Sequence, residues 1–164
     1  MTTESKQQHI DWDILLHDIR SVQNVASIFR MAECLGVNKI YLSGVTPGPL
    51  DRFGFDRPDF LKISLGTEKR VKWERVEKDV LEFISNFDGV RIALEQSENS
   101  VNYKKVEIDA TKKYLIIPGR EVEGLEESIL KICDVVAEIP QYGEKESLNI
   151  FSSMSIACFR FFDL

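Results

Sequence analysis

The feature that most constrains this chain is the order of its apolar segments. Short runs of apolar residues alternate with longer segments in which apolar residues recur every three to four positions. The runs predict strands and the longer segments predict helices. Strands are expected at 12–16, 39–42, 90–94, 114–117 and 135–139, and helices at 19–35, 76–87, 125–132 and 147–161. This alternation predicts an α/β domain with a mostly parallel sheet.

Glycine and proline positions mark where some of these elements end. Gly36 directly follows the first helical segment and is expected to end it, because glycine adopts the left-handed conformation common at helix ends. The segment 46–58 contains three prolines and two glycines and predicts a loop. No internal repeat or low-complexity run divides the 164 residues, so we expect a single domain over 1–164 with its own core.

Composition narrows the class of protein. The chain is 43% hydrophobic and 29% charged, as in globular domains, and no run approaches the roughly 20 apolar residues of a membrane span. The polar residues 1–13 are not typical of a signal peptide. Three widely spaced cysteines, Cys34, Cys133 and Cys158, predict a reducing cytoplasmic location and buried thiols, and neither a disulfide framework nor a zinc site.

Charge is distributed unevenly along the chain. The net charge of −6 disfavours a general nucleic-acid binder, because phosphate contacts require lysine and arginine. The segment 52–75, however, holds seven basic and four acidic residues and is net positive. Two interpretations stay open: a local basic face that contacts RNA, or a solvated loop of mixed charge.

Several common catalytic patterns are absent from the sequence. It contains no dinucleotide-binding glycine fingerprint, no phosphate-binding P-loop and no nucleophile elbow. The two histidines, His9 and His17, lie near the N-terminus, and His17 is expected to pack or cap near the first strand. No cluster of metal-ligating residues is seen, so hydrolysis, redox and kinase chemistry are disfavoured and no metal is expected.

Polar or flexible residues directly follow three of the predicted strands. These segments are 95–97, 118–121 and 140–143. Ligands of parallel sheets bind beyond the carboxyl ends of the strands, so these three turns are the expected binding region.

Three segments also carry a recognisable pattern in a fixed order. Asn24 stands six residues before Arg30 at the start of a helix; 115–125 is a strand followed by Gly-x-Glu-x-x-Gly-Leu; and 139–149 reads Ile-Pro-x-x-Gly-x-x-x-Ser-Leu-Asn. Together they resemble the motifs of the SpoU (TrmH-type) ribose methyltransferases of the SPOUT superfamily. The similarity runs from about His17 to Phe162, and it departs from the family where Ala26 occupies a position that is often glycine.

The resemblance implies a fold, an activity and partners. It implies a SPOUT α/β-knot: a mostly parallel sheet flanked by helices, with the C-terminal part threaded through a loop as a trefoil knot. It further implies an S-adenosylmethionine-dependent 2′-O-methyltransferase of tRNA or rRNA that works as a homodimer, without a metal or membrane partner. No separate RNA-binding domain is expected.

The resemblance also implies catalytic residues, namely Asn24, Arg30, Glu121, Ser147 and Asn149. A guanidinium keeps its proton, with a pKa above about 12, so Arg30 is expected to grip the target phosphate and steady the oxyanion while the proton passes to a phosphate oxygen or water. Asn24, placed on the same side of the helix, would orient Arg30 or the acceptor. By themselves, a helix-capping Asn24 and a solvent-exposed Arg30 remain an alternative.

The cofactor site implied by the resemblance comprises Leu94, Glu95, Gln96, Pro118, Gly119, Glu121, Ile139, Pro140, Ser147 and Leu148. Gly119 and Gly143 would let the backbone approach the adenine, although plain turn glycines remain possible. Glu121 would brace the pocket or Arg30, or complement a helix dipole. Ser147 would also cap the last helix, whose Ser152, Ser153 and Ser155 have no assigned chemistry.

RNA contacts are predicted at Arg30, Arg52, Arg57, Lys69, Arg70 and Lys72. Two other functions stay open. One is an RNA-binding or assembly protein that keeps this fold without methyl transfer. The other is a flavodoxin-like module for another nucleotide, which the missing phosphate loop disfavours.

Overall fold

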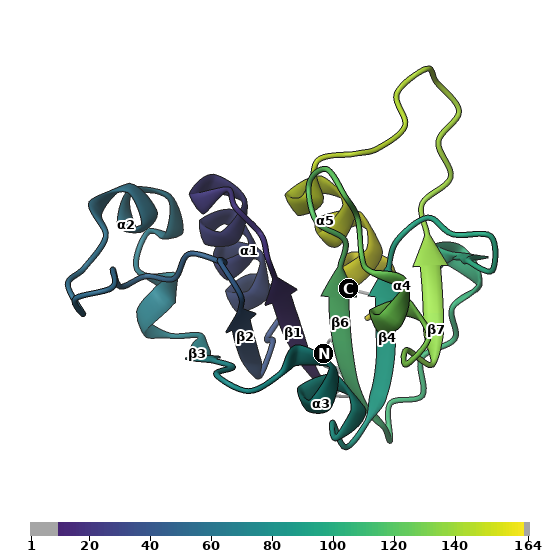
Figure 1. The fold of residues 1–164 in the computed structure, drawn as a ribbon, viewed down its shortest axis with the longest axis horizontal. Coiled ribbons are helices and arrows are strands. Elements are labelled where there is room, and N and C mark those ends of the chain that lie inside the picture. Colours follow the sequence, from purple (N-terminus) through teal and green to yellow (C-terminus); the bar gives the residue numbers. More distant parts are fainter. Residues whose placement is uncertain (1–9, 163–164) are drawn as a thin grey trace, which may run out of the picture.

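The centre of the molecule is one seven-stranded parallel sheet, seen in a computed structural model that describes residues 10–162 (Figure 1). The strand order is β3-β2-β1-β6-β4-β7-β5. The strands are β1 (Asp11–His17), β2 (Lys39–Ser43), β3 (Lys72–Arg75), β4 (Val90–Leu94), β5 (Val101–Asn102), β6 (Lys113–Pro118) and β7 (Val135–Glu138). All their pairings are parallel, so the predicted α/β class is confirmed.

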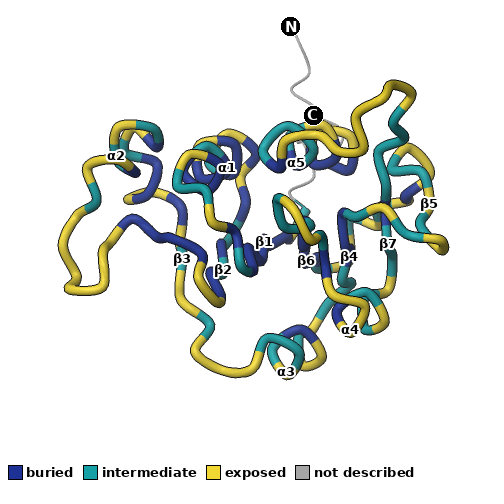
Figure 2. The backbone as a smooth tube through the Cα atoms, turned by 45° about the horizontal axis from the view of Figure 1, so that its top comes forward, coloured by how far each residue is buried: buried dark blue, intermediate teal, exposed yellow. Residues whose placement is uncertain are grey.

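Helices cover both faces of this sheet (Figure 2). They are α1 (Val22–Cys34), α2 (Pro58–Ser64), α3 (Val80–Ser85), α4 (Glu127–Leu130) and α5 (Ile150–Phe161), with short 3-10 turns at Thr67–Lys69 and Tyr103–Lys105. Strand β1 is apolar on both sides, because Ile14 and Leu16 enter the core under α1 and α5 while Leu15 enters the smaller core under α3 and α4. Such continuous burial is typical of a central parallel strand.

The start of α1 and its end follow local capping chemistry. Ser21 is the N-cap, and its hydroxyl accepts a hydrogen bond from the backbone N–H of Asn24 at 3.2 Å. The interpretation of Asn24 as the cap was therefore wrong. Gly36 has a φ of 67° just after the helix, as the sequence predicted.

Other helix boundaries differ from the prediction. The last helix begins at Ile150, with Asn149 as its N-cap, so the predicted start and capping role of Ser147 were wrong. The helices expected at 76–87 and 125–132 are shorter, since Asp79 is the N-cap of α3 and Glu126 is the N-cap of α4. The elements α2, β3 and β5 were not predicted, because they are short and carry weak periodicity.

The cysteines differ in burial. Cys158 is buried, and this burial raises the pKa of its thiol. Burial also raises the pKa of the Cys133 thiol, to about 11. Cys34 is exposed at the end of α1, so its predicted burial was wrong. His9 and most of the polar N-terminal stretch lie outside the described residues.

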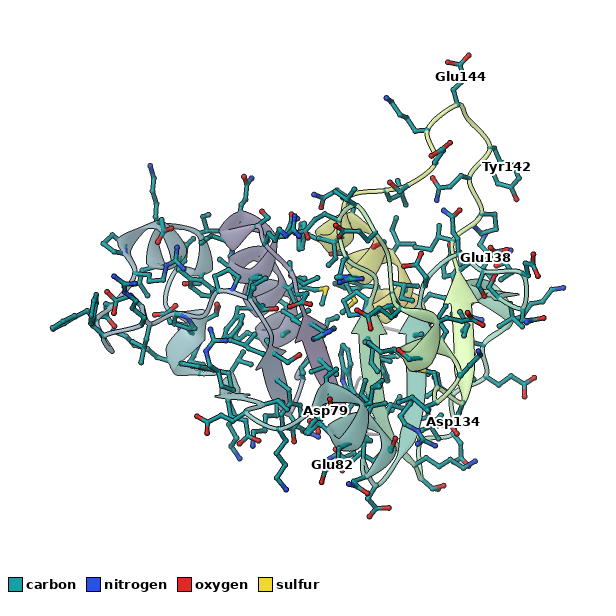
Figure 3. All side chains as sticks on the ribbon, viewed as in Figure 1. Asp79, Glu82, Asp134, Glu138, Tyr142 and Glu144 are labelled. Carbon is teal, nitrogen blue, oxygen red and sulfur yellow. The ribbon has the colours of Figure 1, made fainter. Side chains whose placement is uncertain are left out.

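The carboxyl ends of β1, β2, β4, β6 and β7 lie at one edge of the sheet, where their loops gather (Figure 1). The segment 139–149 leaves β7 there and extends away from the body before α5 begins. Figure 3 shows Tyr142 and Glu144 on this extension and Glu138 at its base, while Asp79, Glu82 and Asp134 lie at the opposite end of the molecule.

Candidate functional site

A pocket opens at the carboxyl ends of β4, β6 and β7, the strand ends that the sequence indicated. It lies between the turn after β6 and the start of α5. Its walls come from three strand-end turns and from the first turn of α5. The lining residues are Leu94, Glu95, Gln96, Gly119, Arg120, Glu121, Glu138, Ile139, Gln141, Ser147, Leu148, Ile150 and Ser153.

Most of the predicted cofactor residues share this pocket. Those that line it are Leu94, Glu95, Gln96, Gly119, Glu121, Ile139, Ser147 and Leu148, whereas Pro118 and Pro140 adjoin it in the chain. The predicted cofactor residues did not include Arg120, Glu138, Gln141, Ile150 and Ser153, although Arg120 and Gln141 lie in the turns expected to bind a ligand. Four of these residues are next to predicted site residues in the chain. Ser153 follows Ile150 by about one helical turn, and this spacing could have identified Ser153.

A chain of side-chain hydrogen bonds joins the three sequence motifs. Asn149 uses its carbonyl oxygen to cap α5, accepting from Phe151 N at 2.9 Å and Ser152 N at 3.2 Å. Its Nδ2 donates to Asn24 Oδ1 at 2.9 Å. The Nδ2 of Asn24 donates to Glu121 Oε1 at 3.4 Å. The starts of α1 and α5 and the turn after β6 are thereby fixed relative to one another.

Glu121 also binds the backbone at the N-terminal end of α1. Its two carboxylate oxygens accept from Ser21 N at 3.1 Å and Arg20 N at 3.3 Å. A carboxylate is favoured here, because the free N–H groups at a helix start carry partial positive charge. Glu121 therefore braces the pocket wall against α1, in line with one of its predicted roles.

Glu95 packs into a cradle formed by two glycines. Its Oε2 accepts from Leu125 N at 2.9 Å and its Oε1 accepts from Gln96 N at 2.8 Å. A Cβ built on Gly119 would lie 2.1 Å from Glu95 Oε2, and one built on Gly124 would lie 2.5 Å from the same atom. A side chain at Gly119 would therefore force the Glu95 carboxylate to move.

Arg120 connects the pocket to the ends of β1 and β2. Its Nε donates to the carbonyl of Gly124 at 2.8 Å, and its Nη1 lies 3.6 Å from Asp18 Oδ2. Asp18 has a φ of 54° and accepts from Val45 N at 3.0 Å. The loop after β2 and the turn after β6 consequently share Asp18 as a common support.

His17 lies at the same strand end, and its contacts indicate a packing role. Its Nδ1 lies 2.9 Å from Ser43 Oγ, and its side chain is buried. Its Nε2 is 3.5 Å from Asp18 Oδ2.

Arg30 lies apart from the pocket lining. It is exposed on α1 and forms no ion pair with another described residue. On an α-helix, two side chains that are six residues apart point in directions about 120° apart. The expected placement of Asn24 and Arg30 on one side of the helix was therefore wrong. Asn24 is buried instead and its amide is used by Glu121 and Asn149.

The basic segment 52–75 lies on the side of α1 away from α5 (Figure 1). Two of its arginines are paired within the molecule: Arg57 with Asp59 at 2.8 Å and Arg70 with Glu33 at 2.8 Å. Lys69 and Lys72 are exposed. The structure therefore does not bring this segment into the pocket.

Two negative findings concern residues 10–162 alone. No group of three or more His, Cys, Asp or Glu side chains there is arranged to hold a metal ion. None of the helices found there has the length and apolar character needed to span a membrane.

Solved structures share this architecture. An AdoMet-bound rRNA methyltransferase from Sinorhizobium meliloti aligns with 94% of the chain and 56% of its own length, at a TM-score of 0.80 and 24% identity. The Aquifex aeolicus TrmH/SpoU tRNA modifying enzyme aligns with 94% of the chain and 75% of its own length, at a TM-score of 0.74. The class of fold is thus the parallel α/β architecture, flanked by helices, that these solved structures share.

Sequence comparison identifies the family within that class. Residues 12–159 match the SpoU rRNA Methylase family, and the chain belongs to it. It is 29% identical over 143 residues to the tRNA (guanosine(18)-2′-O)-methyltransferase of Aquifex aeolicus, covering 85% of this chain. The corresponding enzyme of Thermus thermophilus is 26% identical over 157 residues. The chain spans 63% of the Aquifex protein and 75% of the Thermus protein.

Proposed function

We propose that this chain is an S-adenosylmethionine-dependent 2′-O-ribose methyltransferase acting on tRNA or rRNA. The observation that carries the proposal is the hydrogen-bonded chain from Asn149 through Asn24 to Glu121, set beside a strand-end pocket. Membership of the SpoU family supports it, as do relatives that are named as tRNA and rRNA 2′-O-methyltransferases.

The pocket lining suits S-adenosylmethionine chemically. This cofactor carries a positive sulfonium, an amino group and a carboxylate, together with a flat adenine. Carboxylates of Glu95, Glu121 and Glu138 suit the positive groups, and Arg120 suits the cofactor carboxylate. Apolar walls for the adenine are available from Leu94, Ile139 and Leu148, and Gly119 leaves the backbone accessible.

When bound, the cofactor supplies a methyl group activated by its sulfonium. Transfer would join this methyl group to the ribose 2′-oxygen in place of its bond to sulfur, and the hydroxyl proton would leave to a phosphate oxygen or water. Arg30 is proposed to hold the neighbouring phosphate and stabilise the developing negative charge, because its guanidinium stays protonated. Asn24, Ser147 and Asn149 are proposed to position the acceptor through the fixed starts of α1 and α5.

The proposal also includes the finer features implied by the family resemblance. These are a trefoil knot, a single domain, a homodimer and a cytoplasmic location. Ile156 and Phe159 support a homodimer, because 41% and 45% of their surfaces are exposed on α5. Sedimentation of the purified protein measures the assembly directly.

The test is transfer of label from S-adenosylmethionine to total RNA, followed by mapping of the modified nucleoside. Arg30→Ala should abolish transfer while cofactor affinity, measured by calorimetry, stays within a few fold. Arg160→Ala, which removes another exposed arginine of a helix, is the matched control and should keep activity. Equal activity of Arg30→Ala and the control would remove Arg30 from the mechanism. If calorimetry detects no heat with either S-adenosylmethionine or its demethylated product, an RNA-binding or assembly protein that keeps this fold without methyl transfer would be favoured.

A further inference from the structure

The loop that follows β2 presents two large aromatic side chains to solvent. Phe53 and Phe55 are each 69% exposed, and they lie between Gly44 and Arg57 in a segment coloured as mostly exposed ahead of α2 (Figure 2). Burying a phenylalanine stabilises a fold, so two neighbouring exposed rings are an unusual use of such residues. Exposed apolar groups of this kind mark interaction surfaces.

The loop is held in one shape by its own hydrogen bonds. Asp51 Oδ1 accepts from Phe53 N at 2.8 Å and from Phe55 N at 3.0 Å, and Asp51 N donates to Phe55 O at 2.8 Å. Gly54, at the tip, has a φ of 84° and nothing within 4 Å of a built Cβ. The backbone that carries the rings is therefore ordered before any partner binds, which lowers the entropy cost of binding.

Positive charge lies beside one of the two rings. The cavity next to Phe53 is lined by three arginines, Arg52, Arg57 and Arg75, and by Asp51. The guanidinium of Arg52 lies 4.7 Å from the centre of the Phe53 ring. Aromatic faces beside positive charge are the combination that binds bases and phosphates of unpaired nucleic acid.

The surface is also linked to the pocket of the proposed reaction. Val45, in the same cavity, donates its N–H to Asp18, and Asp18 lies 3.6 Å from Arg120 in the cofactor pocket. The loop and the pocket both lie at the end of the sheet where the strands have their carboxyl ends. The loop that carries the rings is therefore connected to the pocket through Asp18.

We infer that Phe53 and Phe55, with Arg52 beside them, form a stacking surface for unpaired bases of the RNA substrate. This inference rests on the proposed function and adds the class of substrate: RNA that is single-stranded or unstacked next to the modified ribose. Arg57 and Arg75 stabilise the loop, because Arg57 pairs with Asp59 and Arg75 donates to the Thr46 carbonyl at 2.7 Å.

The test compares binding of a fluorescent oligouridylate of about 12 nucleotides with binding of a blunt duplex of equal length, by anisotropy. The native chain should bind the single strand more tightly. Phe53→Ala/Phe55→Ala should weaken single-strand binding by about 5- to 150-fold per lost stacked base and leave duplex binding nearly unchanged. Val101→Ala, an exposed apolar residue on the opposite edge strand, is the control and should bind like the native chain.

A second variant separates stacking from general apolar contact. Phe53→Leu/Phe55→Leu keeps apolar area but removes the aromatic faces, so it should bind the single strand as poorly as the alanine variant. Full single-strand binding by the leucine variant, or a change of assembly in the alanine variant seen by sedimentation, would overturn the inference in favour of a protein contact. Equal binding of both probes by the native chain would also overturn it.

Failure of this inference can be distinguished from failure of the proposed function. Methyl transfer to total RNA and cofactor heat are measured on the native chain independently of the loop variants. If the native chain methylates RNA but the alanine variant binds the oligouridylate normally, only the stacking surface is wrong.

Discussion

Single side chains at this site combine structural and chemical tasks. Asn149 caps α5 with its oxygen and donates its amide N–H to Asn24, so one residue ends a loop and joins two motifs that are far apart in sequence. Glu121 likewise lines the pocket and binds the start of α1. Substitutions at such residues change stability and activity together unless the two tasks are separated by design.

Two substitutions of Asn149 separate capping from the amide contact. Asn149→Ala should lower the free energy of unfolding by about 1 kcal/mol, because the cap is lost. Asn149→Ser keeps a capping oxygen but has no amide N–H to reach Asn24, so it should recover most of that stability. Methyl transfer should fall on the order of tenfold or more in both variants, because small displacements of reacting groups are costly. Urea unfolding and initial rates measure the two effects; full activity in the serine variant would contradict the positioning role of Asn149.

Gly119 and Gly143 provide a matched pair of substitutions. A Cβ on Gly119 would lie 2.1 Å from Glu95 Oε2, whereas one on Gly143 meets nothing within 4 Å. Gly119→Ala should displace Glu95 from Leu125 N and weaken S-adenosylmethionine binding by about tenfold, the equivalent of one hydrogen bond. Gly143→Ala should bind normally. Calorimetry measures both affinities, and equal affinities would show that the Glu95 cradle does not shape the pocket.

At the scale of elements, the central strands were predictable and the peripheral ones were not. Strands β1, β4 and β6 each contain a run of apolar residues, because the sheet is buried on both faces there. The edge strand β3 reads Lys-Trp-Glu-Arg. It is a strand because it pairs with β2, and the local sequence does not encode that pairing. Similarly, the start of α5 depends on the Asn149 cap and not on the serine-rich pattern that begins at Ser147.

The junction of β4 and β7 contains an ion pair whose pH dependence can be tested. Arg91 donates to Asp134 through Nε at 2.9 Å, through Nη2 at 2.9 Å and through its backbone N at 2.8 Å. The hydrogen bond from the Arg91 side chain holds the pKa of Asp134 below its usual value, against the opposing effect of burial. A lowered native pKa means that the unfolded chain binds the proton more readily, so the pair stabilises the fold fully above the usual pKa of about 4.

Asp134→Asn should therefore lower the free energy of unfolding by about 0.5–1 kcal/mol at pH 7, a small value because the aspartate is partly exposed. The difference from the native chain should shrink as the pH falls below about 4 and through the native pKa of Asp134. Glu127→Gln, which removes a more exposed ion pair with Lys131, is the control and should show little change at either pH. Denaturant unfolding across pH measures this, and a constant difference down to low pH would exclude the assigned contribution.

At the scale of the whole molecule, the site is assembled from segments about a hundred residues apart. The sequence motifs identified which segments meet, and the strand-end rule indicated at which edge. Neither could give the hydrogen-bonded order of Asn149, Asn24 and Glu121, because that order depends on tertiary contacts between α1, α5 and the turn after β6. The expected placement of Arg30 beside Asn24 failed for a local reason, because side chains six residues apart on a helix lie about 120° apart.

Charge is also organised across the whole molecule, and its effect on RNA binding can be tested with two variants that change the net charge equally. Lys69→Gln/Lys72→Gln removes two exposed cations from the basic segment and leaves Arg70, which is paired with Glu33. If both lysines contact phosphates, the slope of log affinity against log salt should decrease by about 1 to 2. Lys104→Gln/Lys105→Gln removes two exposed cations beside β5, at the opposite edge of the sheet, and changes the net charge of −6 by the same amount. An equal decrease in both variants would mean that RNA responds to net charge alone, whereas a decrease confined to the first locates the RNA on the side of α2 and β3.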